Sequence, residues 1–111
     1  MSTKRVNFCG SSLRDLRDFP EIARKRSGQQ LRRLQEGLMP EDFKSMKTVG
    51  DGAYEIRVSE DSGAFRVIYV AKFDEVIYVL HCFQKKSQQT SKEDIDLAKR
   101  RYRELLKEVR R

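Results

Sequence analysis

Hydrophobic and polar residues alternate, or form short hydrophobic runs, through the middle of the chain. Residues 54–59 (YEIRVS) alternate with the period of two that is typical of a strand buried on one face. Residues 65–73 and 76–83 are hydrophobic more continuously, as in central strands that are covered on both faces. Residues 43–49 are a further strand candidate, and the turn sequences GDG, DSG and DE separate the four runs. The pattern therefore predicts an antiparallel meander.

The residues before these strands have the spacing of helices. A short strand candidate at residues 4–9 is followed by a helix that Ser11 or Ser12 can cap. Pro20 interrupts this helix, because proline disfavours helical geometry in the residue before it while suiting a new first turn. A second helix follows and ends near Gly37, so we expect a helical hairpin. The inward positions of its second helix are Ile22, Ala23, Leu31 and Leu34.

The end of the chain is predicted to form one more helix. Thr90 and Ser91 precede Glu93 and Asp94 at the spacing of a capping box. One stripe of this helix is hydrophobic, with the members Ile95, Ala98, Tyr102, Leu105, Leu106 and Val109. The order β-α-α-β-β-β-β-α, with helices grouped around an antiparallel sheet, predicts an α+β fold. We expect a single domain over residues 1–111.

Length and composition agree with one small domain and favour a cytoplasmic protein. The chain has 111 residues, of which 38% are hydrophobic and 37% charged, so its core is modest but sufficient for a compact fold. No hydrophobic run reaches the roughly 18 residues that span a bilayer. The first residues, MSTKRVNFCG, lack the hydrophobic core of a signal peptide. We therefore expect a cytoplasmic location and no membrane association.

The charge balance is strongly basic. With 24 Lys and Arg against 17 Asp and Glu, the formal net charge is +7 and the sequence pI is about 9.6. Such a field attracts polyanions, which include nucleic acid, acidic protein segments and anionic membrane surfaces. An ordinary soluble surface that is merely basic is the alternative at this point.

Several kinds of chemistry are excluded by residue content. His81 is the single histidine, so catalysis by a pair of histidines is impossible. Cys9 and Cys82 are too few for a disulfide framework and lack metal-ligand spacing, which favours two reduced thiols. The carboxylates between the strands lie in turns, where they are well solvated, rather than converging on a metal ion. No glycine-rich loop follows a strand and opens a helix, so we expect neither a nucleotide cofactor nor a metal.

Positive charges on the predicted strands are the main functional signal. Arg57 lies within YEIRV and Arg66 within AFRVIY, although most surface charge belongs on helices and loops. Each arginine can be explained structurally, by a salt bridge to Glu55 or to a terminal helix, or by an aliphatic stem that covers hydrophobic surface. Lys85 and Lys86 follow at the exit of the last strand, in FQKKSQQT. A meander would bring these four cations to one face or rim, where they repel one another unless an anion such as phosphate binds among them.

A cluster of this kind suits metal-free cleavage of RNA. The ribose 2′-hydroxyl can attack its neighbouring phosphate if it loses a proton, if the added phosphoryl charge is stabilised, and if the leaving oxygen gains a proton. Arginine stabilises phosphoryl charge through planar, bidentate donation. A lysine placed among other cations has a lowered pKa and can act as base or acid. A tyrosine or His81 can assist.

The same residues resemble a known protein family. YEIRV, SGAFRVIYV and VIYVLHCFQKKSQQTSKEDIDLAKRRYREL are similar to the RelE/HigB-type toxins of bacterial and phage toxin–antitoxin modules, and particularly to the phage-derived HigB-like branch. The resemblance covers residues 54–106, and the preceding helical hairpin agrees with it in order. It implies a RelE-like α+β fold and a ribosome-dependent endoribonuclease, or mRNA interferase, that cuts mRNA in the ribosomal decoding site. It also implies a cognate antitoxin, which in this branch is a helix-turn-helix protein similar to HigA.

The resemblance also implies which residues form the site. The basic residues that hold and cleave the message correspond to Arg57, Arg66, Lys85 and Lys86. Many relatives place a tyrosine after the last strand to stack on a base, whereas SQQTSKED contains no aromatic residue. Tyr69, His81 and Phe83 are therefore the candidates for contacting the substrate. His81 is also explained as a strand residue with a structural hydrogen bond.

Two other hypotheses share much of this pattern. One is a RelE-fold module that binds RNA or its antitoxin without cleaving, and the missing tyrosine favours it. The other is a basic structural domain in which the strand arginines are salt-bridged. Retention of all four cations favours the enzyme.

Overall fold

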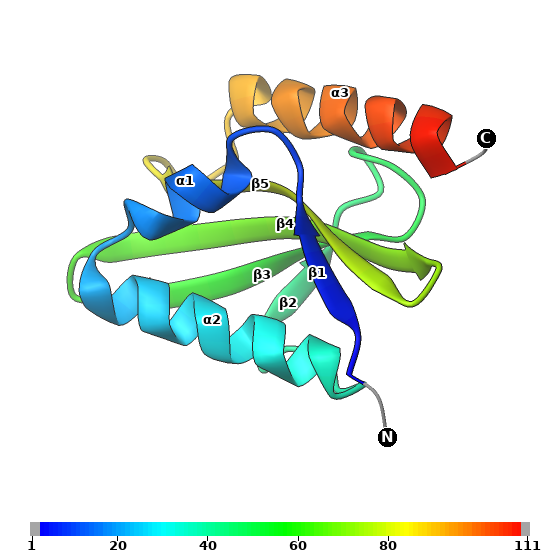
Figure 1. Cartoon of the computed structure of the whole chain (residues 1–111). Coiled ribbons are helices and arrows are strands. Elements are labelled where there is room, and N and C mark those ends of the chain that lie inside the picture. The colour runs from blue at the N-terminus through cyan, green and yellow to red at the C-terminus, as the bar shows by residue number, and fades with distance from the viewer. Residues whose placement is uncertain (1–2, 110–111) are drawn as a thin grey trace.

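The chain forms a five-stranded sheet with three helices, described for residues 3–109 (Figure 1). The structure is a computed structural model. The elements in chain order are β1 (Arg5–Phe8), α1 (Ser12–Arg17), α2 (Glu21–Gln35), β2 (Phe43–Ser45), β3 (Ala53–Glu60), β4 (Gly63–Phe73), β5 (Val76–Lys85) and α3 (Lys92–Val109). This order confirms the predicted α+β class and both helical regions.

Four strands form the predicted antiparallel meander, and the first strand adds to it in parallel. The sheet order is β1-β5-β4-β3-β2, so β2 to β5 are neighbours both in sequence and in space. The turn between β4 and β5 is tight, with Asp74 and Glu75 at φ +52° and +58°, as a two-residue hairpin turn requires. β1 lies parallel to β5, with Phe8 opposite Val79. The sheet is thus mixed at this edge, which the alternation pattern did not predict.

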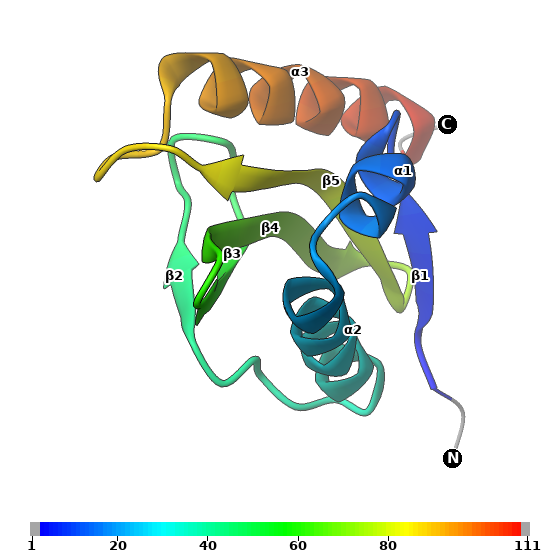
Figure 2. The same ribbon diagram turned by 90° about the vertical axis from the view of Figure 1, so that its left-hand side faces the viewer.

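The sheet separates two hydrophobic cores. The helices α1 and α2 cover one face, and α3 covers the other (Figure 2). The continuous hydrophobic runs of β4 and β5 supply both cores, because alternate strand residues point to opposite faces. The core beneath α1 and α2 includes Leu16, Phe19, Leu31, Leu34, Ile56, Val67 and Tyr69. The core beneath α3 includes Met46, Ile68, Leu80, Phe83, Ala98, Tyr102 and Leu105.

Three details differ from the sequence prediction. β2 ends at Ser45 rather than near Val49, because residues 46–49 close a turn in which the Val49 N–H donates to the Met46 carbonyl (2.9 Å). β5 continues to Lys85, so the first lysine of FQKKSQQT still belongs to the strand. Ile22 was expected to face inward but is 54% exposed.

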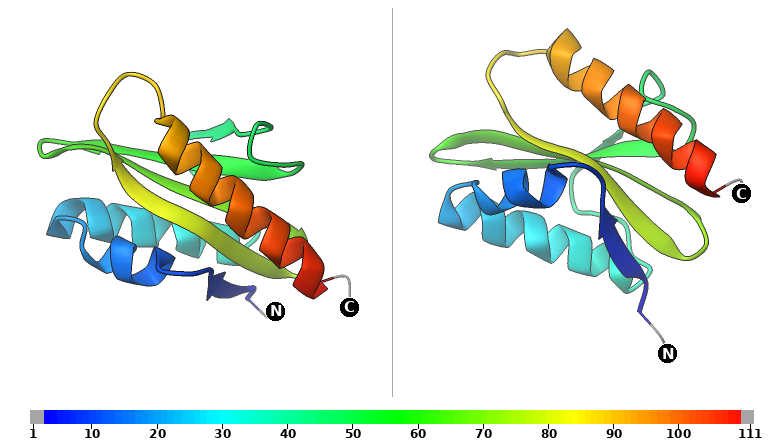
Figure 3. Two further views of the ribbon diagram at one scale, coloured as in Figure 1. Left: turned by 90° about the horizontal axis from the view of Figure 1, so that it is seen from above. Right: turned by 45° about the horizontal axis from the view of Figure 1, so that its top comes forward.

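The predicted cap fixes the start of α3. The Asp94 N–H donates to Ser91 Oγ (3.1 Å), and the Ser91 hydroxyl donates to Asp94 Oδ2 (2.7 Å). Between β5 and this cap, residues 86–91 loop out beyond the sheet (Figure 3). Within residues 3–109, none of the helices combines the length and the apolar character needed to cross a membrane.

Candidate functional site: a basic cavity beside the third helix

Strand register places Arg57 next to Arg66. Arg57 on β3 lies opposite Arg66 on β4, and Arg66 lies opposite Phe83 on β5. Directly opposite residues of antiparallel strands share a face, and Phe83 belongs to the core beneath α3. Lys85, two residues beyond Phe83, projects to the same face and lies opposite Ala64. The sheet therefore brings three of the four predicted cations to one face.

Arg66 is buried and paired with Glu55. Only 4% of Arg66 and 3% of Glu55 are exposed, and Arg66 Nε lies 3.4 Å from Glu55 Oε1. Arg66 Nη1–H donates to the Phe65 carbonyl (2.9 Å), and the Thr90 hydroxyl donates to Glu55 Oε2 (3.2 Å). Burial lowers the pKa of Arg66, and the opposite charge of Glu55 acts against this. The salt bridge that the sequence left open is therefore formed, and Arg66 is not a free cation.

A cavity of about 660 Å³ lies beside this ion pair. It is bounded by β2, β3, the end of β5 and residues 88–90 of the loop that leads to α3. Within the described part of the chain, its basic lining residues are Lys44, Lys47, Arg57 and Lys85, and its one acidic lining residue is Glu55. We call this space the basic cavity.

The cations of the basic cavity are largely without counter-ions. Among residues 3–109, no carboxylate oxygen lies within 4 Å of the ammonium groups of Lys44, Lys47 or Lys85. Arg57 Nε lies 3.9 Å from Asp42 Oδ1, and an exposed pair at that distance stabilises little. The charge of Glu55 is already matched by Arg66. The basic cavity therefore presents excess positive charge, which suits a phosphate.

Of the seven predicted site residues, Arg57 and Lys85 line the basic cavity, whereas Arg66 lies behind it and Tyr69 and Lys86 lie outside it. Tyr69 projects to the opposite face, into the core beneath α1 and α2, and is 1% exposed. Burial raises the pKa of its hydroxyl, which stays protonated. A base held in the basic cavity is separated from Tyr69 by the sheet. Lys86 follows β5 and is exposed at the start of the loop.

His81 and Phe83 attach α3 to the sheet rather than lining the basic cavity. His81 Nε2–H donates to Asp94 Oδ1 (2.7 Å), and Asp94 Oδ2 accepts a second hydrogen bond from Ser91, the residue that caps α3. The rings of His81 and Phe83 stack with their centroids 4.7 Å apart. Both side chains are buried, at 5% and 8% exposure. His81 thus makes the structural hydrogen bond that one of its two explanations predicts, and contact between His81 and a substrate stays a prediction.

Lys44 and Lys47 are the lining cations that sequence reasoning missed. Lys44 lies on β2 opposite Glu55, and Lys47 follows in the turn before β3. Both belong to FKSMK, for which the hydrophobic pattern predicts only a strand. The only available signal was two lysines three residues apart before a turn, and that spacing is common on exposed surfaces.

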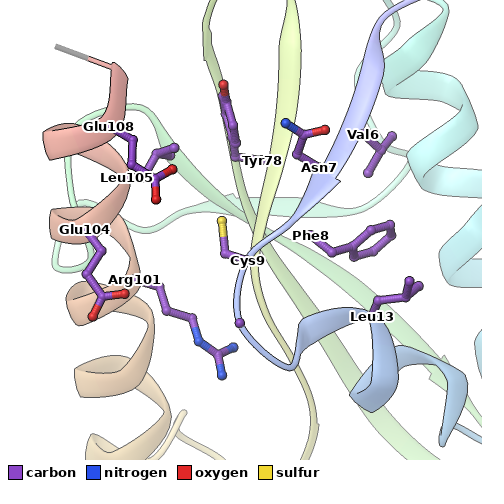
Figure 4. A pocket seen from close by; sticks show the side chains of 11 residues that line it. Val6, Asn7, Phe8, Cys9, Leu13, Tyr78, Arg101, Glu104, Leu105 and Glu108 are labelled. Atoms are coloured by element: carbon purple, nitrogen blue, oxygen red, sulfur yellow. The ribbon is translucent and has the colours of Figure 1, made fainter. Parts of the chain in front are cut away.

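A second cavity, of about 550 Å³, shares no lining residue with the basic cavity. It lies between β1 and α3, where Cys9 faces Arg101, Glu104 and Glu108 (Figure 4). Arg101 is engaged there, with Nη1–H donating to the Leu80 carbonyl (2.8 Å). Because two carboxylates border this space, it is poorly suited to phosphate.

The two thiols are expected to react slowly with alkylating reagents. Burial raises the pKa of Cys82 to about 12, and burial together with Glu108 raises the pKa of Cys9. At pH 8 a thiol with a raised pKa is a smaller fraction thiolate than an ordinary cysteine is, and the thiolate is the reactive form. Iodoacetamide followed by mass spectrometry should modify Cys9 slowly and Cys82 only after denaturation. Rapid alkylation of Cys82 in the native protein would contradict this burial.

Within residues 3–109, no three His, Cys, Asp or Glu side chains are grouped so that they could hold a metal ion. Apart from Glu55 and Glu60 on β3, the acidic residues of this part of the chain lie in turns, loops and helices, and Glu55 is the one acidic residue among them that lines the basic cavity. The groups that the basic cavity offers to a ligand are therefore mainly hydrogen-bond donors with positive charge.

Comparison with known proteins assigns the chain to a family. The model of the family described as phage derived protein Gp49-like (DUF891) matches residues 14–103. The chain belongs to this family. The Gp49-like chain is also similar to a solved structure of the E. coli toxin RelE, a mutant in the free state, with a TM-score of 0.61 and 19% sequence identity over 85% of this chain and 96% of that chain. This similarity confirms the expected RelE-like fold. No curated protein sequence matches the Gp49-like chain.

Proposed function

We propose that this protein is the toxin of a toxin–antitoxin module and cleaves translated mRNA without a metal ion. The observation that carries the proposal is the basic cavity, in which four cations border one space and the single carboxylate is matched by Arg66. Membership of the Gp49-like family and the RelE-like fold support it. The ribosomal decoding site as the place of action, a cytoplasmic location and the HigB-like branch are parts of the same proposal.

The proposed reaction uses the RNA's own hydroxyl group. The ribose 2′-oxygen forms a bond to the adjacent phosphorus, and the bond from phosphorus to the 5′-oxygen of the next nucleotide breaks. The 2′-hydroxyl gives its proton to solvent water and the leaving 5′-oxygen gains one proton, which gives a 2′,3′-cyclic phosphate and a 5′-hydroxyl end. Arg57 and Lys85 stabilise the charge that develops on the phosphoryl oxygens. The Lys85 ammonium group can donate a proton to the leaving oxygen.

The remaining basic residues have supporting roles in this proposal. Lys44 and Lys47 bind the phosphates of flanking nucleotides, because they line the same cavity from the β2 side. Lys86, exposed at the start of the loop, attracts the message without touching the reacting phosphate. Arg66 is a positioning residue: it lies opposite Arg57, and its partner Glu55 accepts the hydrogen bond that ties Thr90 to the sheet.

A binding module without catalysis is the second candidate. Among residues 3–109, no histidine or aromatic side chain lines the basic cavity. These side chains are the commonest proton carriers and base-stacking partners in RNA-binding sites. A protein of this second kind would bind RNA or its antitoxin through the same cations and leave the message intact. In either case we propose a helix-turn-helix antitoxin similar to HigA as its partner.

Ribosomes programmed with a defined mRNA provide the test. The purified protein is expected to cut the message when the ribosome holds it and to leave free RNA intact. A message with a 2′-deoxynucleotide at the cleaved position should resist cutting, because the attacking oxygen is absent. Electrophoresis of end-labelled mRNA measures both outcomes. Equal cutting of the 2′-deoxy message would contradict the mechanism, and binding without any cutting would favour the second candidate.

A further inference from the structure

The basic cavity has uncharged polar lining residues that the proposed reaction does not use. Gln88 and Gln89, in the loop between β5 and α3, line it together with the cations. Both residues are exposed, and among residues 3–109 neither side-chain amide makes a hydrogen bond. Each amide therefore offers an N–H donor and a carbonyl acceptor to a ligand.

Hydrogen bonds on both sides of the two glutamines hold the loop in place. The Ser87 hydroxyl donates to the Gln89 carbonyl (2.8 Å), which closes a turn around Gln88. The Thr90 hydroxyl donates to Glu55 Oε2 (3.2 Å), on the strand that forms one wall of the basic cavity. The two amides are thus carried by a backbone that is bonded to the rest of the fold before a ligand arrives. Such preorganisation lowers the entropy lost on binding.

The basic cavity also has a hydrophobic part. Met46, directly after β2, and Ile95, in the first turn of α3, both line it. Met46 is 7% exposed and belongs to the core beneath α3, and Ile95 packs against that core. Binding sites for small molecules usually combine such a hydrophobic lining with a few polar groups that fix the orientation of the ligand.

These kinds of lining match the parts of a nucleotide. The cations suit a phosphate, whereas an amide carries no charge and is a weaker phosphate ligand. The neighbouring donor and acceptor of an amide instead complement the edge of a base. In single-stranded RNA the bases are unstacked, so their edges are accessible to side chains. The volume of about 660 Å³ also lies within the range of roughly 300–1,000 Å³ that is usual for ligand pockets.

Different segments of the chain supply the charged and the uncharged groups. Lys44 and Lys47 come from β2 and the turn after it, whereas both amides come from the loop after β5. Figure 2 shows this loop and β2 on the same side of the molecule. A nucleotide between them would have its phosphate near the lysines and its base near the loop.

We propose that Gln88 and Gln89 form a base-binding subsite of the basic cavity and determine which nucleotide of the RNA it accepts. At least one of the two amides bonds the edge of the base, and the face of that base lies on Met46 and Ile95. The subsite rests on the proposed function, because both place RNA in the basic cavity. It provides a way to hold a base where, among residues 3–109, the cavity has no aromatic side chain.

Binding of single nucleotides tests the subsite without ribosomes and without cleavage. The four nucleoside 5′-monophosphates are titrated against isotope-labelled protein, and the tightest of them is expected to bind with a dissociation constant of about 1 mM or lower. It should shift the NMR signals of Gln88, Gln89 and Ile95. The tightest and the weakest nucleotide should differ about tenfold in affinity, as expected for one good contact to a base edge. Equal affinities for the four nucleotides and for ribose 5-phosphate, which has no base, would overturn the proposal.

The double variant Gln88→Ala, Gln89→Ala tests the two amides. The affinities of the four nucleotides should then differ by less than about threefold, while ribose 5-phosphate binds as it does to the wild type, because the cations remain. The control Gln29→Ala removes an exposed glutamine of α2 that does not line the basic cavity, and it should discriminate between nucleotides as the wild type does. A double variant that keeps the wild-type discrimination would overturn the proposal.

Programmed ribosomes provide a second measurement that separates the subsite from the proposed function. Messages that differ in the nucleotide on the 5′ side of the cut should be cleaved at rates that differ about tenfold with the wild type and less than about threefold with the double variant. If the double variant cuts with the wild-type base preference, the subsite is wrong and cleavage stands. If the wild type cuts no message but discriminates between nucleotides as expected, cleavage is wrong and the subsite stands.

Discussion

Lys85→Ala is expected to lower the rate of mRNA cleavage by about 100-fold or more, since removing one donor that stabilises transition-state charge has effects of this size. Lys85 lines the basic cavity and has no carboxylate within 4 Å among residues 3–109. Its loss should therefore change the free energy of unfolding by less than about 0.5 kcal/mol. Cleavage of a defined message on programmed ribosomes gives the rate, and urea unfolding gives the stability.

Two control variants test whether cleavage depends on the position of the Lys85 charge or only on the net charge of the protein. Lys107→Ala removes the same charge from the exposed C-terminal part of α3, which does not line the basic cavity, and should cleave at the wild-type rate. Lys86→Ala removes the neighbouring lysine, which is exposed outside the cavity, and should slow cleavage by less than about tenfold. If Lys85→Ala and Lys107→Ala lost activity equally, net charge rather than the basic cavity would govern cleavage.

Arg66→Ala is expected to lower the free energy of unfolding by about 3–5 kcal/mol, because it leaves the buried carboxylate of Glu55 without its partner. The size of the effect depends on burial: the two side chains are 5% and 4% exposed. Domains of this kind are stable by only about 5–15 kcal/mol, so Arg66→Ala should have a much lower melting temperature. Urea unfolding followed by circular dichroism measures the change. Loss of toxicity in Arg66→Ala is therefore no proof of a catalytic role.

A double-mutant cycle shows whether the Arg66–Glu55 ion pair causes the loss of stability in Arg66→Ala. Adding Glu55→Gln to Arg66→Ala should restore part of the stability, because the uncompensated charge is removed. Arg57→Ala is the control, since its side chain is 42% exposed and its contact with Asp42 is 3.9 Å long, and it should cost less than about 1 kcal/mol. Additive effects of Glu55→Gln and Arg66→Ala would contradict a direct coupling between the two side chains.

The order of elements followed from local patterns. The alternation in β3, the longer hydrophobic runs of β4 and β5, and the Ser91 cap are all properties of neighbouring residues, and each was found as expected. The parallel pairing of β1 with β5 joins residues about 70 positions apart, such as Phe8 and Val79. No period within a four-residue strand specifies such a partner.

Only the part of the site that depends on the pairing of neighbouring strands could be predicted from the sequence. Neighbouring strands of a meander place Arg57 and Arg66 together, and the structure has them directly opposite. Sequence alone did not decide whether Arg66 is free or bound to Glu55, because that depends on burial by α3 and the loop before it. The sequence also did not show on which face of the sheet Tyr69 lies, or that Lys44 on β2 lines the basic cavity.

Mapping mRNA 5′ ends across the transcriptome shortly after induction in cells tests metal-free mRNA cleavage at the basic cavity most directly. Wild type and Lys107→Ala should arrest growth and produce new 5′-hydroxyl ends inside translated codons. Lys85→Ala, present at the same level and equally stable, should produce few or none. Growth arrest by the wild type with the messages intact would contradict cleavage, and new ends that persist in Lys85→Ala would contradict the basic cavity as the site.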